Sequence, residues 1–279
     1  MIDLRQSLQY GEYIASLDWR AERINGCQVL FRRLPLIGSL MKTQRPDTIP
    51  FGKIDELAKK YRALFVKLEP VQPLNEVVKE QLHRHRYRQD SWPLLATKTV
   101  WLNLEKSLRF LRQEMTKKTR YCLRKAEQIK IKIGTADNTG KFYENFRKFG
   151  KGYIPKKTQF QALIKAFGQD AILLDIKDLA GTLILVHDKI AYYYFAFTSP
   201  AGRENFAQYL LVWEAIKLAT KRGCRIFDFE GIEDFRYKST RKWAGFSHFK
   251  KSFGGEEIEF PGSFIKIYNP VLRSLPPIA

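Results

Sequence analysis

The chain has 279 residues, of which 44% are hydrophobic and 14% aromatic, so it can bury a large core and is not intrinsically disordered. Its formal net charge is +20, which predicts a polyanionic partner: RNA, a nucleotide-linked substrate or an anionic membrane surface. A basic surface that is merely solvated is the alternative interpretation. The three cysteines lie far apart and the four histidines lack metal-ligand spacing, which predicts a reducing compartment and no metal.

No targeting pattern stands at the start of the chain, because the first residues lack a charged segment followed by an apolar one. The longest apolar run, around Leu183–Val186, is far shorter than a membrane span. We expect a cytoplasmic protein that can contact the inner face of the cell membrane.

The first third of the chain follows a regular plan. Cys27–Thr43 reads as a strand, a turn containing Pro and Gly, and a second strand. A Pro-rich loop and a short helix follow within Arg45–Arg62, and Ala63–Pro70 reads as another strand. A helix is expected over Asn75–Tyr87.

The middle of the chain is strongly basic and helical. Glu105–Gln128 has apolar residues at helical spacing, which predicts one long amphipathic helix. Lys117, Arg120 and Arg124 share a different face of this helix. That face is either simply exposed to solvent or binds phosphate groups, and the pattern favours neither interpretation. A strand with period-two alternation is expected over Ile129–Thr135.

The last third repeats the plan of the first. Ala180–Val186 and Ile190–Phe197 read as a hairpin, a loop leads into a helix over Asn205–Arg222 that Gly223 ends, and Cys224–Gly231 is the closing strand. No residue-level repeat accompanies the duplication, and no heptad pattern predicts a coiled-coil arm.

Candidate chemistry lies in the closing strand and just after it. Alternation along Arg225–Glu230 predicts that Asp228 and Glu230 face the same way, and a carboxylate in an apolar strand must be paired or hydrogen-bonded. Asp228 either neutralises Arg236 or Arg241, caps a loop, or positions a reacting amine or lysine. Lys250 is expected on an aromatic-flanked turn, where a lysine ordinarily extends to water.

Several motifs are missing. The connection Thr198–Gln208 has a single glycine and no Gly-x-Gly, which makes coenzyme A a weak candidate because its pyrophosphate needs close backbone amides. There is no GxSxG or Walker motif. We expect no cofactor.

Three stretches carry a family resemblance: TKTVWLNLEKSLRFLRQEMTKKTRYCLRKAEQIKIKI, YLLVWEAIKLATKRGCRIFDFEGI and GFSHFKKSFGG. Together they resemble the FemABX family of peptidoglycan bridge-forming aminoacyltransferases. FRRLP…KTQRPD is similar to the family's first hairpin and loop. The resemblance implies an α/β (α+β) fold with two acetyltransferase-like domains in tandem and a cleft between them. We place these domains at residues 1–130 and 131–262, with the tail 263–279 packing back on the first.

The resemblance also implies a reaction. Family members move an amino acid from aminoacyl-tRNA to a stem-peptide amine of a peptidoglycan precursor, either lipid II or a UDP-linked muropeptide. By motif position, Lys250 matches the lysine near the acyl-transfer centre, and Asp228 would fix it or accept a proton. The chain would act as a monomer. Residues expected to bind the precursor are Arg33 or Arg32, Tyr194 and Glu230, and those expected to bind tRNA or phosphate are Lys117, Arg120, Arg124, Arg241 and Lys242.

Two other functions stay open. One is an N-acyltransferase that uses acyl-CoA or acyl carrier protein on the same fold, against which the missing Gly-rich loop argues. The other is a non-catalytic protein that binds RNA or an anionic membrane on the same scaffold, which the net charge favours.

Overall fold

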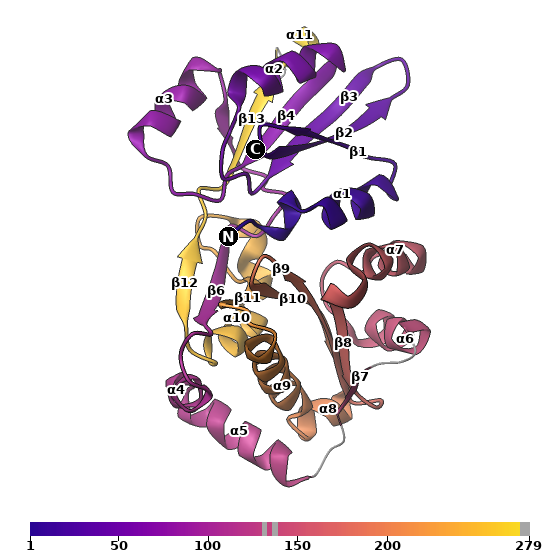
Figure 1. Ribbon diagram of the computed structural model, residues 1–279, viewed down its shortest axis with the longest axis vertical. Coiled ribbons are helices and arrows are strands. Elements are labelled where there is room, and N and C mark those ends of the chain that lie inside the picture. Colours follow the sequence, from indigo (N-terminus) through magenta and orange to yellow (C-terminus); the bar gives the residue numbers. More distant parts are fainter. Residues whose placement is uncertain (130–132, 136–138, 274–279) are drawn as a thin grey trace. The chain divides into compact units, whose positions relative to one another are not determined.

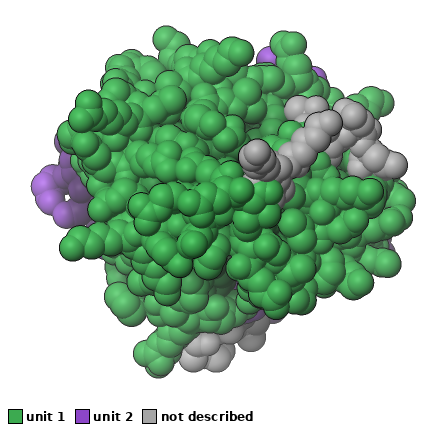
Figure 2. Space-filling model, turned by 90° about the horizontal axis from the view of Figure 1, so that it is seen from below, with its two compact units in different colours: residues 1, 98–258 green, residues 2–97, 259–279 purple. Residues whose placement is uncertain are grey.

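The computed structural model describes residues 1–129, 133–135 and 139–273 (Figure 1). It contains two compact units, coloured separately in Figure 2. Unit 1 comprises Met1 and Lys98–Ile258, and unit 2 comprises Ile2–Thr97 together with the described residues from Glu259 onward. This division differs from the predicted boundary at residue 130, because the strand that begins at Lys98 pairs with the closing strand of the second half of the chain.

Unit 2 is built on a six-stranded sheet in the order β1-β2-β3-β4-β13-β5. The expected hairpin forms between β2 and β3, which pair antiparallel, and α2 connects β3 to its parallel neighbour β4. The tail contributes β13 between β4 and β5, and its residues beyond 273 lie outside the described part of the chain. The elements are α1 (Leu8–Ala15), β1 (Arg20–Ile24), β2 (Cys27–Leu34), β3 (Gly38–Gln44), α2 (Phe51–Lys60), β4 (Ala63–Glu69), α3 (Glu76–Arg84), β5 (Arg88–Asp90), β13 (Ser263–Ile267) and α11 (Pro270–Arg273).

Unit 1 is built on a seven-stranded sheet in the order β12-β6-β11-β10-β9-β8-β7. Much of the strand predicted over Ile129–Thr135 lies outside the described residues, and β7 is its described end. The elements are β6 (Lys98–Asn103), α4 (Leu108–Glu114), α5 (Lys117–Gln128), β7 (Gly134–Thr135), α6 (Thr139–Phe149), α7 (Lys157–Phe167), β8 (Ala171–Ile176), β9 (Ala180–His187), β10 (Ile190–Thr198), α8 (Pro200–Glu204), α9 (Ala207–Lys221), β11 (Ile226–Gly231), η3 (Lys238–Trp243), α10 (Ala244–Lys251) and β12 (Glu256–Glu259).

The two units share one plan, as the sequence predicted. In unit 1, β9 and β10 form an antiparallel hairpin, and α8 and α9 connect β10 to its parallel neighbour β11. This is the order of β2, β3, α2 and β4 in unit 2. Parallel neighbours need a crossover that returns the chain to the same end of the sheet, and a helix supplies it.

A β-bulge in β10 decides which aromatic side chains face which layer of unit 1. Tyr193 pairs with Ile184 and Phe195 with Leu183, so Tyr194 is the extra residue. The bulge reverses the alternation of side chains. Tyr193 therefore packs in the core beneath α5 and α9, whereas Phe195 contacts Phe146 and Phe160 of α6 and α7 on the other face.

Some predicted helices differ from the observed ones. The single helix expected over Glu105–Gln128 is two helices, because Met115 is extended and the hydroxyl of Thr116 caps the start of α5. The helix expected from Asn205 begins at Ala207, after a residue in the left-handed region, Phe206 at φ 54°. It ends as expected, because Gly223 has φ 74° and the amide of Cys224 reaches back to Ala219 O.

Among the described residues, α9 is the longest helix with 15 residues, and none of these helices is long and apolar enough to cross a membrane.

Candidate functional site

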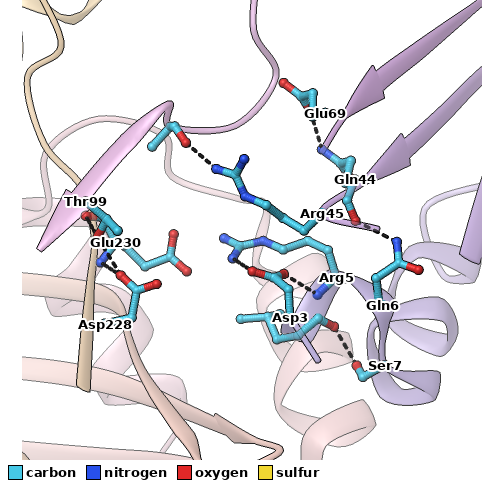
Figure 3. A network of polar contacts seen from close by, with 12 residues as sticks. Asp3, Arg5, Gln6, Ser7, Gln44, Arg45, Glu69, Thr99, Asp228 and Glu230 are labelled. Carbon is cyan, nitrogen blue, oxygen red and sulfur yellow. Dashed lines mark hydrogen bonds and ion pairs between the residues drawn. The ribbon is translucent and has the colours of Figure 1, made fainter. Parts of the chain in front are cut away.

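The candidate site lies at the carboxyl end of β11 and is centred on the buried carboxyl group of Asp228, which is 4% exposed. Thr99 Oγ1, on the neighbouring strand β6, lies 2.5 Å from Asp228 Oδ1 and 2.6 Å from Glu230 O (Figure 3). The backbone amide of Glu230 also donates to Asp228 Oδ1, at 2.7 Å. Asp228 is thus hydrogen-bonded, as a buried carboxylate must be.

The backbone turns sharply after Asp228. Glu230 has φ 60°, an uncommon conformation for a residue other than glycine, and the register with β6 shifts between Asp228 and Gly231. At this irregularity the Glu230 amide turns toward the Asp228 carboxyl group. Arg236, a predicted partner of Asp228, pairs instead with Asp234 at 2.7 Å.

Lys250 occupies the last turn of α10 rather than the predicted turn, and its side chain does not extend to water. The residue is 9% exposed. Its Nζ donates to Gly231 O at 2.7 Å and lies 5.0 Å from the ring centroid of Phe246 and 6.0 Å from that of Tyr193. The ammonium group therefore lies at the end of β11 beside two aromatic rings.

The two ionisable groups have opposite pKa shifts with a common first cause. Burial raises the pKa of Asp228 to about 6, helped by the charge of Glu230 and opposed by hydrogen bonds from Thr99 and the Glu230 backbone. Burial lowers the pKa of Lys250 to about 8, opposed by the charges of Glu230 and Asp228. At pH 7 both groups are mainly charged, and each lies within about one pH unit of exchanging its proton.

A buried polar network supports the ring beneath Lys250. Gln208 Nε2 donates to Tyr193 Oη at 2.6 Å, and Thr198 Oγ1 donates to Gln208 Oε1 at 2.9 Å. Burial raises the pKa of the Tyr193 phenol, so this hydroxyl stays neutral. The network fixes the ring and makes Tyr193 part of the floor of the site.

The residues predicted to bind the precursor are spread over both units. Tyr194 is the bulge residue of β10, and its ring lies 4.8 Å from that of Phe195. Arg32 and Arg33 lie exposed on β2 of unit 2, and the Arg33 guanidinium lies 5.8 Å from the Tyr61 ring centroid. A role for these three residues stays a prediction.

The predicted tRNA-binding residues differ in how available they are. Lys117 and Arg124 are exposed on α5, whereas Arg120 Nη1 donates to the carbonyl oxygens of Gln113 and Met115 at the end of α4. Arg120 therefore has a structural task in holding α4 against α5. Arg241 and Lys242 are exposed on η3, directly before the helix that carries Lys250.

Sequence reasoning missed Thr99, which lies 129 positions before Asp228. Thr99 is one of three polar residues in β6, so its position in the sequence did not distinguish it. Within residues 1–129, 133–135 and 139–273, no group of three or more His, Cys, Asp or Glu side chains could hold a metal ion.

Comparison with known proteins identifies relatives of this segment. Residues 156–276, which include Asp228 and Lys250, match the model of the FemAB family. Aminoacyltransferase FemA of Staphylococcus aureus is 35% identical over 77 residues. That alignment covers 28% of this chain and 18% of FemA, so the chain spans about a fifth of the curated relatives that it matches.

Solved structures resemble the chain over nearly its full length. A crystal structure of FemX has a TM-score of 0.81 at 16% identity, covering 97% of this chain and 93% of that one. A tandem GNAT protein from the clavulanic acid biosynthesis pathway has a TM-score of 0.55 at 9% identity, covering 89% and 82%. These likenesses confirm the predicted fold of two acetyltransferase-like domains in tandem.

Proposed function

We propose that this chain, whose residues 156–276 match the FemAB family and whose fold is similar to that of FemX, transfers an amino acid from aminoacyl-tRNA to a stem-peptide amine of a peptidoglycan precursor. The acceptor is lipid II or a UDP-linked muropeptide, and a lipid-linked acceptor would bring the enzyme to the inner face of the cell membrane. The observation that carries the proposal is the buried Lys250 ammonium group, hydrogen-bonded to Gly231 O beside Asp228.

The reaction needs little covalent chemistry from the protein. The acceptor amine attacks the ester carbonyl carbon of the donor, a C–N bond forms and the C–O bond to the tRNA ribose breaks. The amine loses a proton and the ribose oxygen gains one. Since an ester is an activated donor, the enzyme has to orient two reactants and stabilise the tetrahedral oxyanion.

Lys250 suits the stabilisation of that oxyanion. An ammonium group has three N–H donors, and among the described residues Gly231 O takes one of them. The other two donors remain for the oxyanion. The ammonium group is also a compact positive charge in a buried site, where a charge acts more strongly than in bulk solvent. Loss of one donor of this kind costs about 100- to 1,000-fold in kcat.

Asp228 has the complementary role. With a pKa of about 6, its carboxyl group is mainly ionised at pH 7 and can hold the Lys250 ammonium group or accept the proton that the attacking amine loses. Its hydrogen bonds to Thr99 and the Glu230 amide fix its position before substrate binds. The arrangement of Lys250 and Asp228 favours aminoacyl transfer over simple RNA binding, because RNA binding does not need a buried lysine and a buried aspartate at one site.

The test compares two adjacent lysines. Purified wild type, Lys250→Met and Lys251→Met are incubated with charged tRNA and, in separate reactions, with lipid II and UDP-linked muropeptide. Lys251 is the matched control, because it lies on the same helix but forms a 2.7 Å ion pair with Glu257, which is not part of the candidate site. We expect Lys250→Met to lose about 100-fold or more in kcat and Lys251→Met to retain activity.

Acyl-CoA replaces charged tRNA in a parallel reaction. Transfer from acyl-CoA but not from tRNA would replace this proposal with an N-acyltransferase. Equal transfer by wild type and Lys250→Met would refute the role of Lys250, and transfer by neither protein with any donor would favour a non-catalytic protein.

A further inference from the structure

The exposed face of α5 combines an aromatic ring with positive charges. Tyr121 is 47% exposed, and Arg124 and Lys125 each place their charged group 5.9 Å from its ring centroid. Lys117 and Lys118 are exposed at the start of the same helix. Glu127 is the one acidic residue of α5, and it pairs with Arg112 at 2.7 Å.

Aromatic rings continue from Tyr121 toward the candidate site. Its ring centroid lies 6.5 Å from that of Phe206, which lies 6.3 Å from Tyr209, which in turn lies 5.0 Å from Phe249. We call these four rings the aromatic track. Tyr121 is exposed, the other three are partly exposed, and Phe249 directly precedes Lys250.

Hydrogen bonds join α5, which carries Tyr121, to the residues that follow α10, which carries Phe249. Thr119 Oγ1 donates to Ser252 Oγ at 2.7 Å, and the amide of Thr116 donates to Ser252 O at 2.9 Å. Ser252 follows α10, two residues after Lys250. The basic helix and the helix that carries Lys250 are therefore fixed to one another within unit 1.

We propose that the aromatic track binds the unpaired 3′ end of the tRNA, with Tyr121 stacking on a base and the cations of α5 contacting the backbone. This inference rests on the proposed function, whose donor carries its ester at that end. Single-stranded nucleic acid is bound without base preference by a basic surface with aromatic rings, because every base presents a π face. Cations alone would suit duplex RNA or an anionic membrane equally well; the exposed ring between them favours an unpaired strand.

The test measures binding directly, by fluorescence anisotropy at fixed salt. One RNA hairpin carries a four-nucleotide 3′ single strand, and the other has the same stem with a blunt end. We expect Tyr121→Ala to bind the first RNA about tenfold more weakly and the blunt RNA unchanged, whereas Tyr121→Phe retains wild-type affinity. Tyr153→Ala removes a tyrosine that is 68% exposed elsewhere in unit 1 and should change neither affinity. Lys125→Ala should weaken both RNAs alike and flatten the salt dependence.

Three outcomes would overturn the aromatic track. They are equal binding of the single-stranded RNA by wild type and Tyr121→Ala, equal loss of both RNAs in Tyr121→Ala, and binding of anionic vesicles with no detectable affinity for either RNA. The transfer assay separates the two proposals. If wild type transfers amino acid but Tyr121→Ala binds normally, the track alone fails. If Tyr121 proves necessary for binding but no protein transfers amino acid, the track stands and the proposed reaction fails.

Discussion

Replacing Thr99 with valine removes one hydroxyl group and keeps the shape of the side chain. In the wild type this hydroxyl lies 2.5 Å from Asp228 Oδ1 and helps to hold down a pKa that burial has raised to about 6. A hydrogen bond to a charged group is worth about 1.5–3 kcal/mol, and about 1.4 kcal/mol corresponds to one pH unit. The variant should therefore move the pKa of Asp228 upward by about one pH unit or more.

The consequence for activity depends on pH. If the ionised form of Asp228 is the active one, a move of one pH unit lowers the active fraction about fivefold at pH 6, about twofold at pH 7 and hardly at all at pH 8. The assay is the pH profile of kcat/KM for amino-acid transfer. An acid limb at the same pH in wild type and Thr99→Val would refute the reasoning, whatever the absolute rates.

Stability supplies a second readout. The pKa of Asp228 in the folded state exceeds its ordinary value of 3.8, so the folded state binds more protons between these values and loses stability as pH rises from about 4 to 6. In Thr99→Val this loss should continue to about pH 7. Thr182→Val is the matched control: it removes another buried hydroxyl, which donates to Phe195 O at 3.0 Å, and should lower stability without extending that pH range.

Two further predictions concern the wild type and the fold. The pH profile of wild-type kcat/KM should be bell-shaped with apparent pKa values near 6 and 8, because the active site needs ionised Asp228 and protonated Lys250. Lys250→Arg should move the alkaline limb of this profile beyond pH 10, because arginine keeps its proton. If the alkaline limb does not move, a group other than Lys250 causes it. A Cβ at Gly202 would lie 2.1 Å from Leu179 O, so Gly202→Ala should lower the free energy of unfolding by about 1–3 kcal/mol in urea titrations. Gly245→Ala, whose Cβ would meet nothing within 4 Å in α10, should be neutral or stabilising, and equal effects of the two substitutions would contradict this packing argument.

The sequence predicted the features that depend on local pattern. The hairpins, the crossover helices and the closing strand with Asp228 each follow from periodicity and from turn residues such as Gly223, whose left-handed backbone ends α9. The repeated order of these elements predicted the tandem arrangement. The net charge of +20 likewise needs no coordinates to indicate a polyanionic partner.

The tertiary structure decided what the local pattern left open. An ordinary lysine among aromatic residues extends to water, and only the packing of α10 against the end of β11 buries Lys250 and lowers its pKa to about 8. Thr99 reaches Asp228 across 129 positions of sequence, and the irregularity at Glu230 turns an amide toward the same carboxyl group. Periodicity in a sequence shows which face of an element is buried, but the pKa of a side chain depends on the dielectric and the charges that distant elements bring to it, so the site exists only once the strands have paired.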